Sequence, residues 1–451
     1  MAAPPSSSRG RSLLGRLTST SDAGVTLIEL MAAILVFGIA ATGLMAGFIS
    51  VGKKTRADEN RVAAANLAAR ELEITRNQFT ASSSGPTTVA GTSLVTNGNP
   101  LPGGTVGNPL VVDNVPYTVT RRVEWVPAGT GQSACDGGSS VTYPTLAVQV
   151  SVSWPNMGNV KPVEANTILT PPKGVLSSTI GFVAIKVTGA NSQPQENLPV
   201  TITGPGGTYT AVTADDGCAV VESAVPGSYT AGVSKSGWVD FYGVAAPTKP
   251  VTIASGAINR YSFSYDKAAT LQESMVTTSG YALPTGLRSV TLGNAGLTPS
   301  QTALKDVGGT GSANIASLWP FTDGYSVWAG SCTQSNPATA GGSTPTAIVI
   351  PPGGNASTTV QLGAIAITVT TTGSLAVPNA TVTATPVNTA GCATTENPLV
   401  LGTTNGSGVL ATSLPAGAWV IKVSGRTATT WPTTSSMLPT NPPTSISVVV
   451  Q

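Results

Sequence analysis

The residue types needed for most hydrolytic and metal chemistry are scarce in this chain of 451 residues. Histidine is absent, which excludes Ser-His-Asp triads, Cys-His pairs and His-ligated metal sites. The cysteines lie far apart, without the C-x-x-C spacing of structural zinc and redox sites. We therefore predict no enzymatic activity, no metal site and no cofactor.

The cysteines can instead form disulfides. Their even number fits two bridges if the domains that carry them face an oxidising exterior. More than one pairing is open, and the sequence does not choose among them. The candidates are Cys135, Cys218, Cys332 and Cys392.

Three other groups of residues could do chemistry. Asp215 and Asp216 could act as paired carboxylates or calcium ligands, but a turn explains them better because they precede Gly217 between two predicted strands. Lys186 could form an isopeptide bond, but no Asn or Glu can be assigned opposite it. Five aromatic residues could stack on sugar rings if exposed, although filling sandwich cores is the favoured role. These are Trp238, Tyr242, Trp319, Trp328 and Trp419.

Composition favours an array of small β domains. Only 9% of residues are charged and 5% are aromatic, while Gly (51) and Pro (34) are abundant. Such a composition favours short strands and turns, and the chain is longer than one hydrophobic core usually serves. The net charge of +2 is spread thinly, so we predict no nucleic-acid binding.

The N-terminal segment combines a polar leader with a long apolar run. Residues 1–24 are Ser-rich and carry three arginines, and Val25–Val51 contains a single charge, Glu29. The run is long enough to cross a bilayer as a helix. A secretory signal would be cleaved after its apolar core, whereas here the small residue Gly24 precedes the run. A carboxylate inside a membrane helix needs a partner, and the nearest candidate for Glu29 is the amine of Val25.

The segment Gly24-Val25-Thr26-Leu27-Ile28-Glu29-Leu30 resembles the type IV prepilin cleavage and methylation motif. The resemblance implies that a prepilin peptidase cuts after Gly24 and methylates the amine of Val25. It also implies that Glu29 pairs with the Val25 amine of a neighbouring subunit and sets axial register. The usual first residue is Phe, so Val25 departs from the pattern. The alternative is an interfacial glutamate at the end of an ordinary membrane anchor.

The helix is expected to continue beyond the membrane. Val62, Ala65, Ala69 and Leu72 recur at helical spacing, which predicts one helix over 25–78 with residues 25–51 in the membrane. We expect the apolar stripe to face a sheet, residues 81–109 to form a long loop, and strands over 117–126 and 146–155. A helix on a small antiparallel sheet resembles the pilin fold, with residues 79–173 as its β domain.

A degenerate repeat follows the pilin-like unit. In the first copy, two strand patterns precede Asp215-Asp216-Gly217 and then Pro226-Gly227-Ser228-Tyr229; in the last copy, the same order ends in Asn405-Gly406-Ser407-Gly408 and Pro415-Ala416-Gly417-Ala418-Trp419. A divergent copy lies between them. The pattern resembles carboxypeptidase regulatory-like and collagen-adhesin B-type domains, which implies Ig-like or prealbumin-like β-sandwiches. The expected repeats are 174–267, 268–361 and 362–451.

The sequence thus predicts an α+β pilin unit followed by an array of all-β sandwiches, anchored by one membrane pass with its C-terminal domains outside the cell. The resemblance implies a minor type IV pilin that carries an adhesive array and that has a prepilin peptidase, other pilin subunits, the assembly machinery and the membrane as partners. A surface glycan or protein is the expected ligand. Two alternatives stay open: a pseudopilin of a secretion or DNA-uptake system, and a carbohydrate-binding surface protein that never polymerises.

Overall fold

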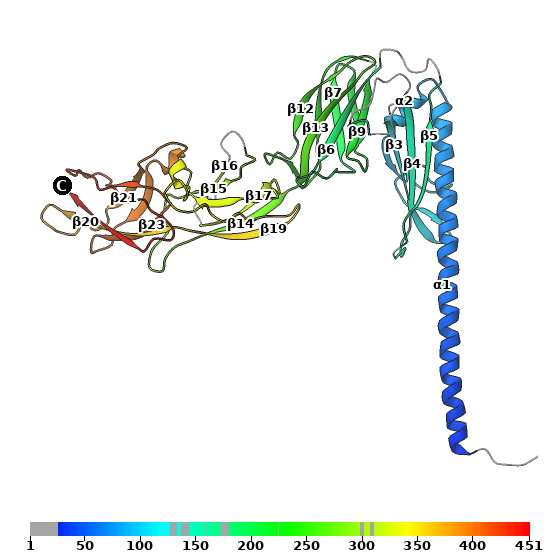
Figure 1. Cartoon of the computed structure of the whole chain (residues 1–451), viewed down its shortest axis with the longest axis horizontal. Helices are drawn as coiled ribbons and strands as arrows, with labels where there is room; N and C mark the ends of the chain where they lie inside the picture. The colour runs from blue at the N-terminus through cyan, green and yellow to red at the C-terminus, as the bar shows by residue number, and fades with distance from the viewer. Residues whose placement is uncertain are drawn as a thin grey trace, which may run out of the picture.

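The structure is a computed structural model that describes residues 26–126, 133–136, 144–158, 160–172, 180–223, 225–297, 302–306 and 311–451. Its N-terminal element is α1 (Leu27–Thr80), a helix of 54 residues that is about 80 Å long at the usual rise per residue. The predicted helix over 25–78 is therefore present with slightly shifted ends, and Val25 lies outside the described residues. Figure 1 shows α1 as a long column at one side of the molecule.

A small antiparallel sheet packs along the C-terminal half of α1 (Figure 1). The elements that follow α1 are α2 (Gly85–Ala90), β1 (Leu94–Thr96), β2 (Leu110–Val112), β3 (Val115–Val126), β4 (Thr145–Ser153) and β5 (Val163–Leu169). The strand order in the sheet is β1-β3-β4-β5, and β2 also pairs with β3. The predicted loop over 81–109 is wrong in part, because it contains the helix α2 and the strand β1, which pairs with β3. We call residues 26–172 the helix-bearing unit.

The face of α1 that meets the sheet differs from the predicted one. Val62 is 62% exposed, and Ala65 and Ala69 are also exposed, whereas Leu72 is half-buried and packs on the core as predicted. The buried face is offset from this stripe and consists of Ala64, Leu67, Ala68, Glu71, Thr75 and Phe79. The hydrophobic pattern did not predict this face because two of its residues are polar. The Glu71 carboxylate and the Thr75 hydroxyl are buried there with hydrogen-bond partners from other segments.

Three β-sandwiches follow, and each repeats one topology. In each sandwich the first strand pairs in parallel with the last strand on one side. On its other side it pairs antiparallel with the fourth strand of the same sandwich. The divergent middle copy keeps this order. The predicted fold class, a long helix on a small sheet followed by β-sandwiches, is confirmed.

The first sandwich contains β6 (Gly181–Thr188), β7 (Pro199–Gly204), β8 (Gly207–Val212), β9 (Cys218–Ser223), β10 (Gly227–Val233), β11 (Trp238–Asp240), β12 (Thr248–Ile253) and β13 (Ile258–Lys267). The second contains β14 (Ala269–Val276), β15 (Ser289–Gly293), β16 (Thr302–Asp306), β17 (Ser312–Leu318), β18 (Ser326–Ala329), the 3-10 turn η1 (Thr333–Ser335) and β19 (Asn355–Gln361). The third contains β20 (Gly363–Thr371), β21 (Thr381–Pro386), the 3-10 turn η2 (Thr394–Glu396), β22 (Leu399–Thr403), β23 (Val409–Leu414), β24 (Trp419–Val423) and β25 (Thr444–Val450).

The apolar cores run across the joints between these units. One cluster of buried residues joins the sheet of the helix-bearing unit to Phe182, Ala184 and Val220 of the first sandwich. Another continues through the second and third sandwiches, and the first sandwich also has a core of its own. The sandwiches extend end to end away from α1, so the C-terminus lies far from the helix (Figure 1).

Candidate assembly surface and interdomain joints

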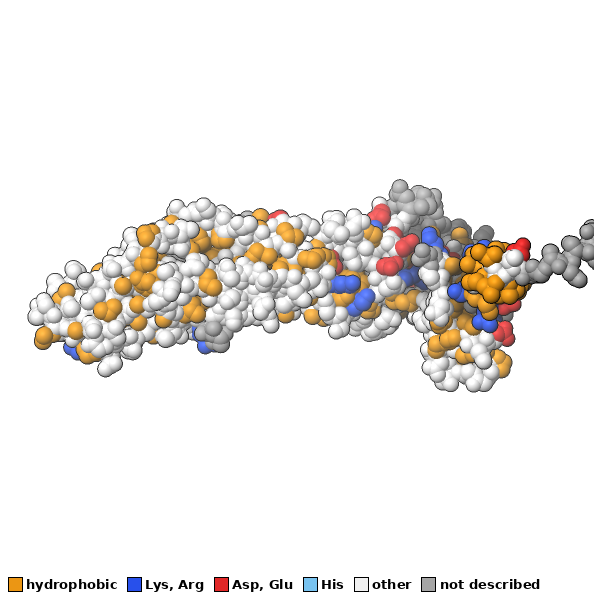
Figure 2. Space-filling model, turned by 90° about the horizontal axis from the view of Figure 1, so that it is seen from below, with side chains coloured by type: hydrophobic (Ala, Val, Ile, Leu, Met, Phe, Trp, Pro, Cys, Tyr) orange, Lys and Arg blue, Asp and Glu red, His pale blue; other side chains and the backbone are white. Residues whose placement is uncertain are grey.

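The membrane-facing half of α1 is an uncovered apolar surface. The helix is long and apolar enough to cross a membrane, and its apolar half is not buried against the rest of the described chain. Phe37 and Phe48 are each 75% exposed. Figure 2 shows this end of the helix as a dense cluster of hydrophobic side chains. An apolar surface of this kind must be covered by lipid or by other helices.

Glu29 lies in the first turn of α1 and caps it. Its Oε2 accepts hydrogen bonds from the backbone N of Thr26 at 3.0 Å and from the Thr26 hydroxyl at 2.9 Å. The Thr26 hydroxyl in turn accepts a hydrogen bond from the Glu29 N at 3.4 Å, which completes a capping box. The carboxylate therefore sits where the helix dipole favours negative charge. The predicted cleavage residues Gly24 and Val25 lie outside the described residues.

A buried polar network joins α1 to the sheet. Arg121 on β3 is 4% exposed, and its guanidinium donates to Thr75 Oγ1, Gln78 Oε1 and Thr92 Oγ1. Glu71 lies 4.0 Å from the same guanidinium and accepts a hydrogen bond from Asn99 Nδ2 at 2.8 Å. Burial lowers the pKa of Arg121, and Glu71 opposes that shift. The sequence showed no sign of this network because its members come from four separate segments.

We call the contact between the helix-bearing unit and the first sandwich the proximal joint. A disulfide and several charged side chains cross it. Cys135 is bonded to Cys218, with their Cα atoms 5.8 Å apart. Beside the disulfide, Lys186 Nζ lies 3.0 Å from Asp136, and Arg122 donates to the Thr213 carbonyl at 2.7 Å. The structure therefore places Lys186, once a candidate for an isopeptide bond, in an ion pair across the joint.

Two carboxyls in the proximal joint have raised pKa values. Burial raises the pKa of Glu124 to about 8, with Asp216 and Asp215 adding to the shift and Arg122 opposing it. Burial alone raises the pKa of Glu222 to about 7. Both groups are thus partly protonated near neutral pH.

The carboxylates of this joint do not make a metal site with the neighbouring sulfur. Glu124, Asp216 and Cys218 offer ligand atoms within 4.8 Å of one another. The Cys218 sulfur is in a disulfide and is not available as a thiolate ligand. Asp216 accepts a hydrogen bond from the Cys218 N at 2.8 Å, and Gly217 has a φ of +75°. Asp216 thus has the turn role that the sequence favoured.

We call the contact between the second and third sandwiches the distal joint. A disulfide crosses it too, but few charged side chains lie there. Cys332 is bonded to Cys392. Glu396 of η2 is 1% exposed. It accepts hydrogen bonds from the backbone N of Ser289 and Ser331 and from the Ser331 hydroxyl, at 3.1, 2.8 and 2.6 Å. Gln334 donates to the Ala418 carbonyl at 2.9 Å and accepts from the Asn388 N at 3.0 Å.

Most of the aromatic candidates for sugar stacking are in cores. Trp238, Trp319, Trp328 and Trp419 are 7%, 4%, 6% and 1% exposed, whereas Tyr242 is 60% exposed. Trp419 also donates its indole N–H to the Pro415 carbonyl at 3.1 Å. These positions agree with the core role that the sequence favoured for the tryptophans.

Comparison with known proteins identifies the N-terminal segment. Residues 20–45 match the family described as the prokaryotic N-terminal methylation motif. No curated protein is significantly similar to the chain. The match covers Gly24, Val25 and Glu29 and continues into α1, and it confirms the predicted prepilin-type motif.

Several solved structures show a weak likeness. The Bacillus anthracis TIE protein is 14% identical over 76% of this chain and 72% of that chain, with a TM-score of 0.20. BcpA, the major pilin subunit of Bacillus cereus, is 11% identical over 60% of this chain and 99% of that chain, with a TM-score of 0.19. GBS52, the minor pilin of Streptococcus agalactiae, is 10% identical over 60% of this chain and 95% of that chain, with a TM-score of 0.15. Scores this low carry no argument about function. The chain therefore has a prepilin-type N-terminal motif that runs into a long apolar helix, and a small sheet packs along the C-terminal half of this helix.

Proposed function

We propose that this protein is a minor type IV pilin. Its mature helix, starting at Val25, joins a filament through the apolar segment 25–51, and its sandwiches are displayed outside the cell for adhesion. The observation that carries the proposal is the coincidence of the methylation motif over 20–45 with the start of a helix whose apolar half is uncovered. A membrane-embedded prepilin peptidase and other pilin subunits are the partners that this requires.

The shape of the molecule supports a tip or side position over a place in the shaft. The sandwiches extend away from α1 instead of lying along it (Figure 1). A subunit repeated along a fibre would bring each array against its neighbours, whereas a subunit at the tip or at sparse sites has room. We also propose that the chain divides near residues 173, 267 and 361, with two of these joints reinforced by disulfides.

Assembly is proposed to use Glu29 in two successive ways. Before assembly the carboxylate is satisfied within its own chain by Thr26. After cleavage, the methylated amine of Val25 in a neighbouring subunit supplies a positive charge in the low dielectric of the membrane, where an ion pair is strong. The exchange would set the axial register between subunits.

The test is intact mass spectrometry of the full chain from its native membrane, combined with recovery of the chain in sheared filaments. We expect a chain that begins at methylated Val25. Glu29→Gln should reduce recovery in filaments at least about tenfold, while Glu59→Gln, an exposed glutamate further along the same helix, should leave it unchanged. A chain that still begins at Met1 would contradict the proposal and favour a static surface anchor.

A further inference from the structure

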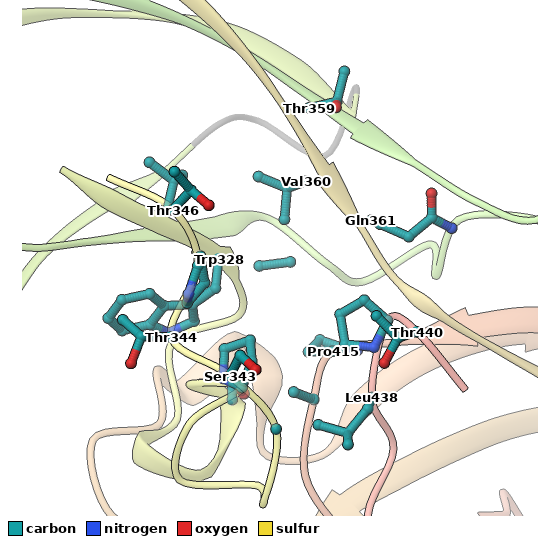
Figure 3. A pocket seen from close by; sticks show the side chains of 18 residues that line it. Trp328, Ser343, Thr344, Thr346, Thr359, Val360, Gln361, Pro415, Leu438 and Thr440 are labelled. Atoms are coloured by element: carbon teal, nitrogen blue, oxygen red, sulfur yellow. The ribbon is translucent and has the colours of Figure 1, made fainter. Parts of the chain in front are cut away.

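A pocket of about 370 Å³ opens in the distal joint. One wall comes from β18, the loop after η1 and the end of β19, and the other from loops of the third sandwich. Figure 3 shows Trp328, Ser343 and Thr344 on one side, Pro415, Leu438 and Thr440 on the other, and Val360 and Gln361 above them. Its volume lies at the small end of the usual range for ligand pockets, about 300–1,000 Å³.

The pocket is held open by bonds that cross the joint. The disulfide between Cys332 and Cys392 fixes the start of the loop that forms one wall. Gln334 ties that loop to the third sandwich through Ala418 and Asn388. Further along the loop, Ser436 donates to the Ala340 carbonyl at 2.6 Å. A ligand would therefore meet a formed site, without the entropic cost of ordering loops.

The chemistry of the lining selects a neutral ligand. None of the residues that line the pocket is charged. A charged ligand would lose hydration there without gaining a counter-ion, which is costly. The lining combines apolar surface from the half-buried Pro345, Leu438 and Pro439 with polar side chains. The polar ones are Ser335, Ser343, Thr344, Thr346, Thr359, Gln361 and Thr440.

This combination fits a saccharide better than a peptide. Pro-rich peptides dock in grooves lined by several exposed aromatic rings, but Trp328 is the aromatic residue of this lining and is 6% exposed. Its ring packs so closely on Gly293 that a Cβ there would lie 2.7 Å from it. A pyranose ring presents C–H faces to apolar walls and hydroxyl edges to Ser, Thr and Gln side chains. Such a ring matches both parts of the lining.

We propose that the pocket in the distal joint binds a neutral saccharide, such as a terminal hexose or N-acetylhexosamine. This inference rests on the proposed adhesive function and gives it a site and a ligand class. The second and third sandwiches, which line the pocket, lie in the outer part of the array, well away from α1 (Figure 1).

The test uses the full chain in detergent micelles on an array of immobilised neutral glycans, with sialylated glycans and a hexaproline peptide as the competing ligand classes. The blocking variant is Ser343→Trp, because Ser343 is exposed at the pocket wall and an indole there would fill the pocket. The matched control is Ser407→Trp, at an exposed turn outside the pocket. Hits are then confirmed by titration with the free sugar.

We expect binding of at least one neutral glycan, weakened on the order of tenfold or more by Ser343→Trp and unchanged by Ser407→Trp. The inference is overturned if no neutral glycan binds, if binding is confined to sialylated glycans or hexaproline, or if Ser343→Trp binds as the unmodified chain does. Because the assay needs no filament, its failure leaves assembly untouched. Loss of assembly in the Glu29→Gln experiment, conversely, says nothing against the pocket.

Discussion

The proximal and distal joints are both crossed by a disulfide, yet different forces hold them. The proximal joint has an ion pair, a half-buried arginine that donates to a backbone carbonyl, and carboxyls of raised pKa. The distal joint continues one apolar core and uses backbone and amide hydrogen bonds around a single buried carboxylate. Figure 2 shows the same contrast, with charged side chains gathered near the helix-bearing unit and a largely uncharged outer array. A charged joint can respond to pH and salt, whereas a largely uncharged one should respond little to either.

The largest effect is expected from Glu396→Ala in the distal joint. The variant leaves the donors of Ser289 and Ser331 without their acceptor in a site that is 1% exposed. We expect a loss of about 3–5 kcal/mol in the free energy of unfolding of the second and third sandwiches. Calorimetry checks it, with the exposed Glu196→Ala as control. A loss no larger than that of the control would mean that the carboxylate does not hold the distal joint.

The second effect compares the two disulfides directly. Replacing either pair by serine should cost about 2–4 kcal/mol, since the bridges span 83 and 60 residues. Without its bridge, the proximal joint should open further when NaCl rises from about 0.05 to 0.5 M, because its ion pair is screened. The distal joint should not respond. Limited proteolysis of each variant at both salt concentrations measures the opening, and equal responses would contradict the comparison.

The sequence predicted the local elements of this fold better than the contacts between them. The turn before β9, where Gly217 adopts positive φ, and the matching turn before β23 at Gly408 were visible because Asp-Gly and Asn-Gly patterns act locally. The methylation motif was visible for the same reason. The buried face of α1 was predicted only at Leu72, since Glu71 is buried only because Arg121 and Asn99 meet it from distant segments. The pairing of the cysteines and the distal pocket likewise depend on contacts between remote segments.

A smaller effect follows from the raised pKa of Glu124 in the proximal joint. Its folded-state pKa is about 8, against an ordinary value of 4.5, so the folded chain holds this proton over a pH range in which the unfolded chain has released it. Stability should therefore fall as pH rises from about 4.5 to 8. Glu124→Gln should match the parent at pH 4 and exceed it at pH 9 by about 1–3 kcal/mol, allowing for partial exposure. Thermal unfolding at both pH values measures this, and a variant that is less stable at pH 9 would contradict it.

The smallest effect concerns the ion pair of Lys186 with Asp136. The two side chains are 23% and 53% exposed, so water screens the pair, and exposed pairs are worth about 0.2–1 kcal/mol. Cys135 precedes Asp136 directly and is held by the disulfide, which reduces the side-chain entropy lost when the pair forms. We therefore expect a coupling energy near the upper end of that range in a double-mutant cycle of Lys186→Met and Asp136→Asn. The coupling energy should be smaller in the variant that lacks the disulfide. In that variant the backbone at Asp136 is no longer fixed through Cys135, so forming the ion pair costs more conformational entropy. A coupling that is unchanged there would show that the ion pair and the disulfide stabilise the proximal joint independently.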